Sequence, residues 1–157
     1  MSEKYDIESF INQVITTIKD NLSAKVNEIN SEKFDTIRIE NIPGEAFFDD
    51  VNQQVFNKDS FIYYTIVNID TETVGGTTKM EVTLAVSVIL SDTGETGMLS
   101  KMLRYSRCLR EIIQSNFKKS ASTSPLRISE FVPADVELSQ GGGFKISGIQ
   151  IKTFITG

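Results

Sequence analysis

The sequence predicts an α+β fold in which a mostly antiparallel sheet of four to six strands carries two main helices and a long projecting β-hairpin. Three observations support this class. Two segments have apolar residues at helical spacing, several segments alternate between apolar and polar residues, and turn-forming glycines separate them. The chain has 157 residues, the size of one ordinary domain, so we expect residues 1–157 to form a single domain.

The first helix is predicted from residue 7 onward. Its apolar residues recur at steps of three and four, which places them on one stripe that can lie on a sheet. Asp6 or Ser2 can cap its start, and Asn27, Asn30 and Ser31 mark its end. The apolar positions are Ile7, Phe10, Ile11, Val14, Ile15, Ile18, Leu22, Val26 and Ile29.

A short strand is predicted over residues 34–42, because Ile37, Ile39 and Ile42 follow an alternating pattern that ends at Pro43-Gly44. The next stretch, residues 45–60, mixes aromatic and valine side chains with acids and amides. It fits either a loop or an extra strand, and the sequence leaves this open.

The strongest strand signals are residues 61–70 and 79–90, which predict a long antiparallel hairpin. The first is rich in aromatic and β-branched residues, and the second alternates strictly. Residues 71–78 form the polar, glycine-containing loop between them. Strands of about ten residues exceed the usual five or six, so we expect the tip of the hairpin to project and to be open to a partner.

The second helix is predicted from residue 98 to about residue 117. Its apolar stripe faces the sheet, Arg104, Arg107 and Lys118 fall on the opposite side, and Arg110 borders the stripe. Two further strands close the fold, residues 126–132 and 144–156. The stretch 136–138, Gly141-Gly142-Gly143 and the last strand indicate a second hairpin, and a change of apolar phase at Ser147-Gly148 predicts a β-bulge in that last strand.

Composition argues against most catalytic chemistry. The chain has no His, no Trp and one Cys, Cys108, which excludes histidine-based general bases, Ser-His or Cys-His pairs and zinc sites made of His or paired Cys. Asp92-Thr93-Gly94 resembles the loop of aspartic proteases, but that chemistry needs two such loops and the sequence has one. We therefore expect a protein that is not an enzyme and that needs no cofactor and no metal.

The net charge of −5 conceals an asymmetry. Residues 1–97 carry 7 Lys and Arg against 17 Asp and Glu, whereas residues 98–157 carry 9 against 4. Such a chain can bind nucleic acid through its basic part, or bind another copy of itself acid to base. The charged residues predicted to form the interface between copies are Lys101, Arg104, Arg107 and Arg110 on the second helix, and Glu45, Asp49 and Asp50 in the acidic stretch.

The order of elements carries a resemblance. A chain with an amphipathic first helix, a long hairpin, a helix containing Leu103-Arg104-Tyr105-Ser106-Arg107-Cys108-Leu109-Arg110 and a closing hairpin resembles the tail terminator, or tail completion, proteins of tailed phages and phage-tail-like contractile particles. The resemblance covers most of the chain and depends on element order and hairpin length rather than on an invariant motif.

The resemblance implies a structural virion protein that forms a hexameric ring on the last ring of the tail tube. Such a ring stops polymerisation of the tube and sheath and presents the attachment surface for the head or neck. Its partners are further copies of the chain, the tube and sheath proteins and a neck or head-completion protein; DNA only passes through the lumen. It is assembled in the host cytoplasm and resides in the tail or neck of the virion. The resemblance implies that the hairpin, including its strands over residues 61–70 and 79–90, makes inter-subunit or tube contacts. The tip residues expected to take part are Thr71, Glu72, Thr73, Val74, Gly75 and Gly76.

Two other functions stay open. A neck or head-tail connector subunit would have the same shape without capping the tube. A small nucleic-acid-binding module would use the basic helix 98–119 to contact phosphates, with binding that weakens as salt rises. No apolar run is long enough to span a membrane, so no membrane partner is expected.

Overall fold

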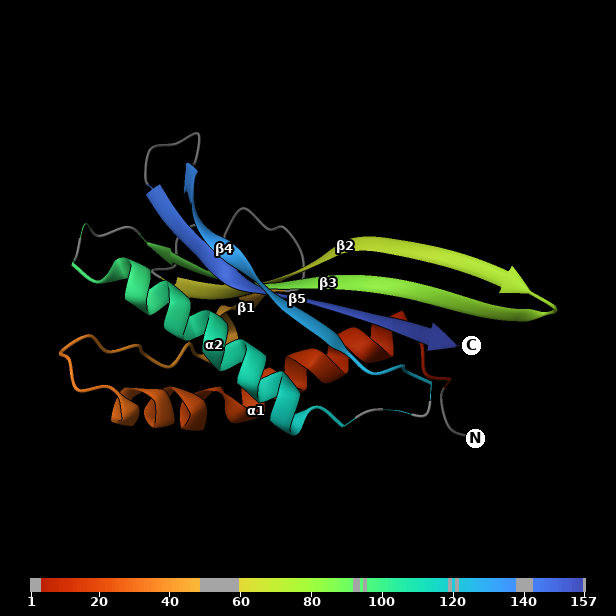
Figure 1. Cartoon of the computed structure of the whole chain (residues 1–157), viewed down its shortest axis with the longest axis horizontal. Helices are drawn as coiled ribbons and strands as arrows, with labels where there is room; N and C mark the ends of the chain where they lie inside the picture. The colour runs from red at the N-terminus through yellow and green to blue at the C-terminus, as the bar shows by residue number, and fades with distance from the viewer. Residues whose placement is uncertain are drawn as a thin grey trace.

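A computed structural model describes residues 4–48, 60–91, 94, 96–118, 120, 122–137 and 143–156. These residues form a five-stranded sheet in the order β1-β2-β3-β5-β4 with two helices (Figure 1). Strands β2, β3, β5 and β4 pair antiparallel, and only the two-residue β1 pairs parallel to its neighbour β2. The prediction of an α+β class is therefore confirmed.

Helix α1 (Ile7–Glu32) begins and packs as its sequence predicts. Asp6 caps it: the Ser9 amide donates to Asp6 Oδ1 at 2.9 Å, and the Asp6 amide donates to Ser9 Oγ at 3.3 Å. This reciprocal capping box satisfies two amides that the first turn would leave unpaired. The buried stripe consists of Phe10, Val14, Ile18, Leu22, Val26 and Ile29.

The predicted strand over residues 34–42 is wrong. The segment pairs with no strand that the structure describes. Ile39 and Ile42 are buried, as the alternating pattern indicates, whereas Phe34 at the start of the segment is fully exposed. Its backbone bonds side chains instead: the Asn30 amide group of α1 donates to the Ile39 carbonyl at 2.8 Å and accepts from the Ile39 N–H at 3.0 Å. Beyond it come the short helix η1 (Gly44–Ala46) and β1 (Phe47–Phe48), so the stretch after residue 45 starts as an extra strand.

The first hairpin consists of β2 (Ser60–Val74) and β3 (Thr77–Ser91), 15 residues each. Their pairing continues to Val74 and Thr77, so the turn is only Gly75-Gly76 rather than the eight-residue loop that the sequence predicts. Both glycines have positive φ, 61° and 82°, as a tight hairpin turn between twisted strands requires. Figure 1 shows this turn beyond the ends of both helices.

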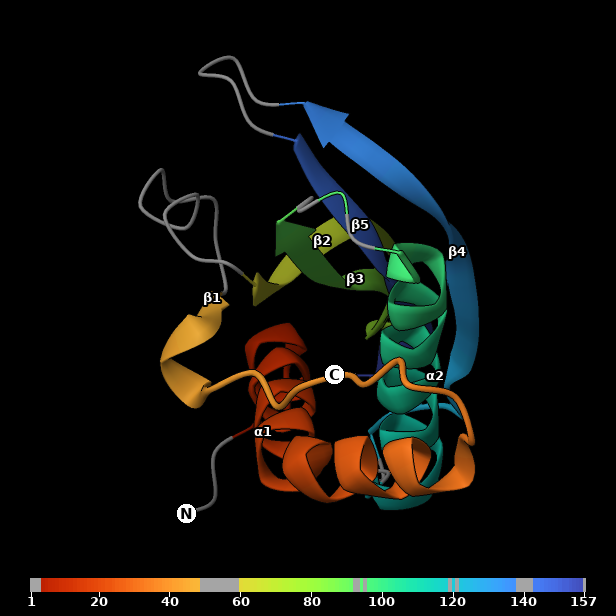
Figure 2. The ribbon, with the colours of Figure 1, turned by 90° about the vertical axis from the view of Figure 1, so that its left-hand side faces the viewer.

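Helix α2 (Met98–Asn116) follows Gly97, whose φ is 92°. The helix packs against α1 on one side and against β5 and β4 on the other (Figure 2). Its buried side chains join those of α1 and the sheet in one core. The largest fully buried side chains of that core are Phe10, Phe61, Ile18, Leu22, Ile29, Ile62, Leu84, Leu109, Ile112, Ile113, Ile149 and Ile151.

The closing hairpin consists of β4 (Arg127–Glu137) and β5 (Gly143–Thr156). The predicted bulge in the last strand is wrong, because β5 pairs with β3 in unbroken register from Ser91–Phe144 to Lys79–Thr156. The shift lies in β4 between Phe131 and Ala134. The extra residue therefore falls at Val132-Pro133, where proline has no N–H to donate to a ladder.

Candidate interaction surface

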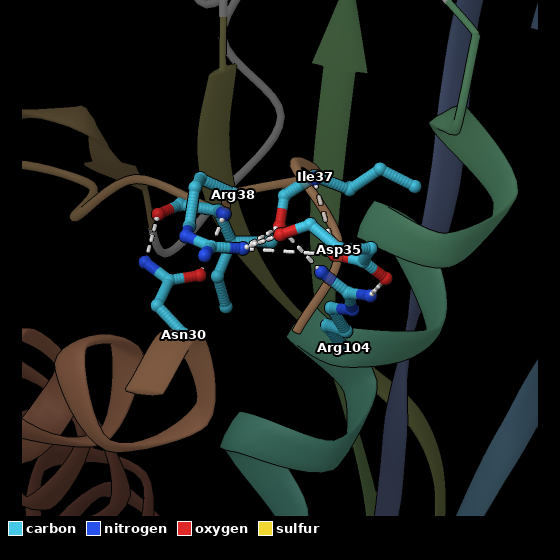
Figure 3. A network of polar contacts seen from close by, with 6 residues as sticks. Asn30, Asp35, Ile37, Arg38 and Arg104 are labelled. Atoms are coloured by element: carbon cyan, nitrogen blue, oxygen red, sulfur yellow. Dashed lines mark hydrogen bonds and ion pairs between the residues drawn. The ribbon is translucent and has the colours of Figure 1, made fainter. Parts of the chain in front are cut away.

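The second helix does not present Arg104 to solvent. The Arg104 side chain is only 8 % exposed and reaches the segment between α1 and η1 (Figure 3). Its Nη2 lies 2.5 Å from Asp35 Oδ2, and its Nη1 donates to the Ile37 carbonyl at 2.6 Å. On the next residue, the Tyr105 hydroxyl donates to the Glu40 carbonyl at 2.8 Å and accepts from the Glu40 N–H at 3.0 Å. Arg104 and Tyr105 thus attach residues 35–40 to α2.

The charges of Arg107 and Arg110 are also compensated within the chain. Arg107 lies 2.7 Å from a Glu32 carboxylate oxygen and 2.5 Å from Glu111, while Arg110 lies 3.4 Å from Glu130. Burial opposes ionisation of Glu111, but the hydrogen bond and charge of Arg107 outweigh it and hold the pKa of this carboxyl below its usual value. The carboxylate partners Asp35, Glu32 and Glu130 come from three other segments, and no local spacing in the sequence indicates them.

The other charged residues of the predicted interface lie elsewhere. Lys101 is half-buried in the first turns of α2. Glu45 belongs to η1, and Asp49 and Asp50 lie outside the described residues. The three arginines already bond carboxylates of their own chain. Helix α2 lacks the uncompensated row of guanidinium groups that phosphate binding through it would need.

Cys108 is fully buried in α2 and carries no free reactive thiolate at neutral pH. Burial raises the pKa of its thiol to about 12, because the charged form would lose its hydration. We expect a thiol reagent such as dithionitrobenzoate to leave the native protein unmodified and to modify one thiol per chain in denaturant. Rapid modification of the native protein at pH 7 would contradict this burial.

The tip of the first hairpin is exposed. Each residue from 71 to 76 faces solvent, which includes the acid Glu72 and the apolar side chain of Val74, 67 % exposed. Below the tip, Ile66, Val67 and Ile69 of β2 are also about half exposed. The resemblance implies contacts along the strand over residues 61–70 as well as at the tip. It does not single out these three residues, because a strand pattern does not reveal which strand lies at the edge of a sheet.

A second group of exposed apolar side chains lies on the other side of the molecule. Leu99 and Leu103 of α2 and Val132 of β4 are at least half exposed. Leu99 lines a shallow pocket with Pro133 and Ala134, so this half of α2 lies against the bulge of β4. The protein thus carries exposed apolar side chains near both edges of its sheet, a distribution that favours contact with other macromolecules.

Among the described residues, no cluster of His, Cys, Asp and Glu side chains could hold a metal ion. Neither of the helices described is apolar enough along its length to cross a membrane. In comparisons with known proteins, no family model and no curated protein sequence matches this chain.

Proposed function

We propose that the protein is a structural subunit of a tailed phage or a phage-tail-like particle, and that its copies form a ring that caps the tail tube and stops tube and sheath growth. The hairpin of β2 and β3 is the observation that carries this proposal. Its 15-residue strands place an exposed tip beyond the helices, with an exposed valine at its end. Such an arm suits a subunit whose task is to contact other proteins.

The energetics support an assembling subunit. Complete burial of a valine or isoleucine side chain contributes about 2 kcal/mol, so burial of the exposed part of Ile66, Val67, Ile69 and Val74 on the β2 arm would contribute about 1 kcal/mol each. Contact with a partner would remove these side chains from water without any change of the fold. In this proposal the tip contacts the last ring of the tube, and the opposite surface receives the neck or head-completion protein.

The alternative of a neck or head-tail connector uses the same features, so the test has to observe tail length. In the strain that encodes the protein, deletion of its gene is expected to give tails longer than the normal length, seen by negative-stain microscopy. Tails of normal length that stay separate from heads would support the connector and overturn the tube cap.

A point variant tests the role of the tip. We expect Val74→Glu to give the same overlong tails, because a charge at the tip opposes burial against the tube, while the free energy of unfolding changes by less than about 0.5 kcal/mol. Val132→Glu is the matched control, since Val132 is 83 % exposed but lies on β4, away from the arm. Normal tails with Val74→Glu would exclude the tip as the tube contact.

A further inference from the structure

Among the described residues, nothing pairs with the outer backbone of residues 64–74 of β2 or of β4, at the two lateral edges of the sheet. Beyond Phe47 and Phe48, which pair with Ile62 and Tyr63, no described residue pairs with the outer side of β2, so within the described part of the chain the outward N–H and C=O groups of residues 64–74 have no strand partner. At the other side of the sheet, β4 has no described neighbour beyond it. Unpaired strand edges of this length are templates for pairing with another chain.

The directions of the two edge strands are compatible. Three antiparallel pairings separate β2 from β4, so these strands run in opposite directions within one copy. A second copy related by rotation about an axis along the strands would place its β2 antiparallel beside the β4 of the first copy. This contact is head-to-tail, with different surfaces on its two sides, and it repeats until the rotation closes a ring.

The strand pairings within one copy also indicate which residues would meet. On the face away from the helices, Asn68, Thr83, Lys152 and Arg127 form one row across the sheet. On the helix face, Ile66, Leu84, Ile151 and Ile128 form another. If both rows continue into the next copy, Arg127 lies opposite Asn68, and Ile128 lies opposite Ile66.

Charge favours this alignment. Asp70 accepts a hydrogen bond from Asn68 at 3.0 Å on the same face, which makes Asp70 the diagonal neighbour of the incoming Arg127. Arg127 is exposed and forms no ion pair with a carboxylate of the described residues. Asp70 likewise forms no ion pair with a Lys or Arg side chain among them. The acidic edge on β2 and the basic residue at the start of β4 are therefore complementary across copies rather than within one.

We infer that successive copies of this chain join edge to edge, with residues 64–71 of one copy antiparallel to residues 124–130 of the next, so that the sheet continues from copy to copy. The inference rests on the proposed function only for the choice of a second copy as the partner. In this junction the charged contact between copies is made by Asp70 and Arg127, and not by the basic residues of α2 that the sequence predicts. Burial of Ile66 against Ile128 adds an apolar contact on the helix face.

A disulfide tests the junction directly. Within one copy, positions 68 and 127 are three strand spacings apart, about 14 Å, beyond the Cα separation of about 7 Å that a disulfide allows. A chain with Asn68→Cys and Arg127→Cys can therefore form that bond only between copies. After mild oxidation, we expect a ladder of covalent oligomers on a non-reducing gel, whereas each single variant stays monomeric because its cysteine faces a native residue. Cys108 is buried and does not take part.

The matched control is Thr77→Cys with Arg127→Cys, which places an exposed cysteine on the same hairpin outside the junction and is expected to give no ladder. Asp70→Arg is expected to weaken association about fivefold, and adding Arg127→Asp is expected to restore it. Light scattering measures the association, and circular dichroism verifies the fold of each variant.

The outcomes separate the junction from the proposed function. A ring without the 68–127 ladder, dimers from Asn68→Cys alone, or a protein that stays monomeric at its highest attainable concentration would each overturn the junction. A ladder together with normal tail length in the deletion strain would leave the junction intact and overturn the tube cap.

Discussion

Gly148→Ala is expected to lower the free energy of unfolding by about 4 kcal/mol, because backbone strain and overpacking each contribute roughly 2 kcal/mol. Gly148 lies in β5 with φ of 153°, a conformation that side chains rarely adopt. A Cβ there would lie 2.1 Å from the Val86 carbonyl oxygen and 2.8 Å from Cζ of Phe131. The backbone of β3 cannot move away without breaking its pairing with β5 in the interior of the sheet.

Urea unfolding followed by circular dichroism measures this loss. Gly44→Ala is the control, since a Cβ at Gly44 would have no atom within 4 Å, and it should change stability by less than about 0.5 kcal/mol. Adding Phe131→Ala to Gly148→Ala should not restore stability, because the contact with the Val86 carbonyl remains. If Gly148→Ala is as stable as the native protein, the register of β3 with β5 differs from the one described.

Arg104→Met is expected to cost about 2 kcal/mol, since the Ile37 carbonyl would lose the buried one of its two charged donors and the Asp35 carboxylate would lose its hydrogen bond from Arg104. Methionine keeps the length of the side chain and its packing, so the loss reports on hydrogen bonding. Arg38→Met is the matched control. Arg38 also donates to the Ile37 carbonyl, at 2.8 Å, but it is half exposed and its replacement should cost less than about 0.5 kcal/mol.

The cost of Arg104→Met should depend on pH. The hydrogen bond from Arg104 holds the pKa of the Asp35 carboxyl below its ordinary value, although burial opposes this shift. A carboxyl whose pKa is lower in the folded protein stabilises it above its ordinary pKa, about 3.9, and this stabilisation is lost as pH falls through the folded pKa. The difference between native protein and variant should therefore be larger at pH 7 than at pH 3. A difference that grows on acidification would contradict the Arg104–Asp35 pair.

The helices and the long strands could be predicted because one periodicity governs each of them. Apolar residues at three- and four-residue steps fix α1 and α2, and alternation fixes β2 and β3. The error over residues 34–42 has a physical cause: the segment alternates like a strand, but Asn30, Arg104 and Tyr105 take the place of a neighbouring strand. Sequence periodicity shows which side chains are buried and does not show what bonds the backbone.

The candidate surface was predictable only in part. A helical projection places Arg104 opposite the apolar stripe, yet α2 is covered on that side as well by the segment that follows α1. The exposed tip of the hairpin followed from its glycines and polar residues. The sequence could not identify Asp70, Ile66 and Arg127 as interface residues, because their position at a sheet edge depends on the strand order. That order pairs β3 with β5, although α2 and β4 lie between these two strands in the chain.

That strand order also sets the sequence of folding events. Strand β3 can pair with β2 at once through a two-residue turn, but its other side has to wait until α2, β4 and β5 have been synthesised. The loop between β3 and β5 contains α2 and β4, and closing it costs conformational entropy before the contacts between the two strands can form. The docking of β5 should therefore be the slow step. Until then β3, most of whose side chains are wholly or partly buried in the native protein, has an open side in the nascent chain. An unpaired strand side of this kind exposes the chain to premature association at β3 before the native sheet is complete.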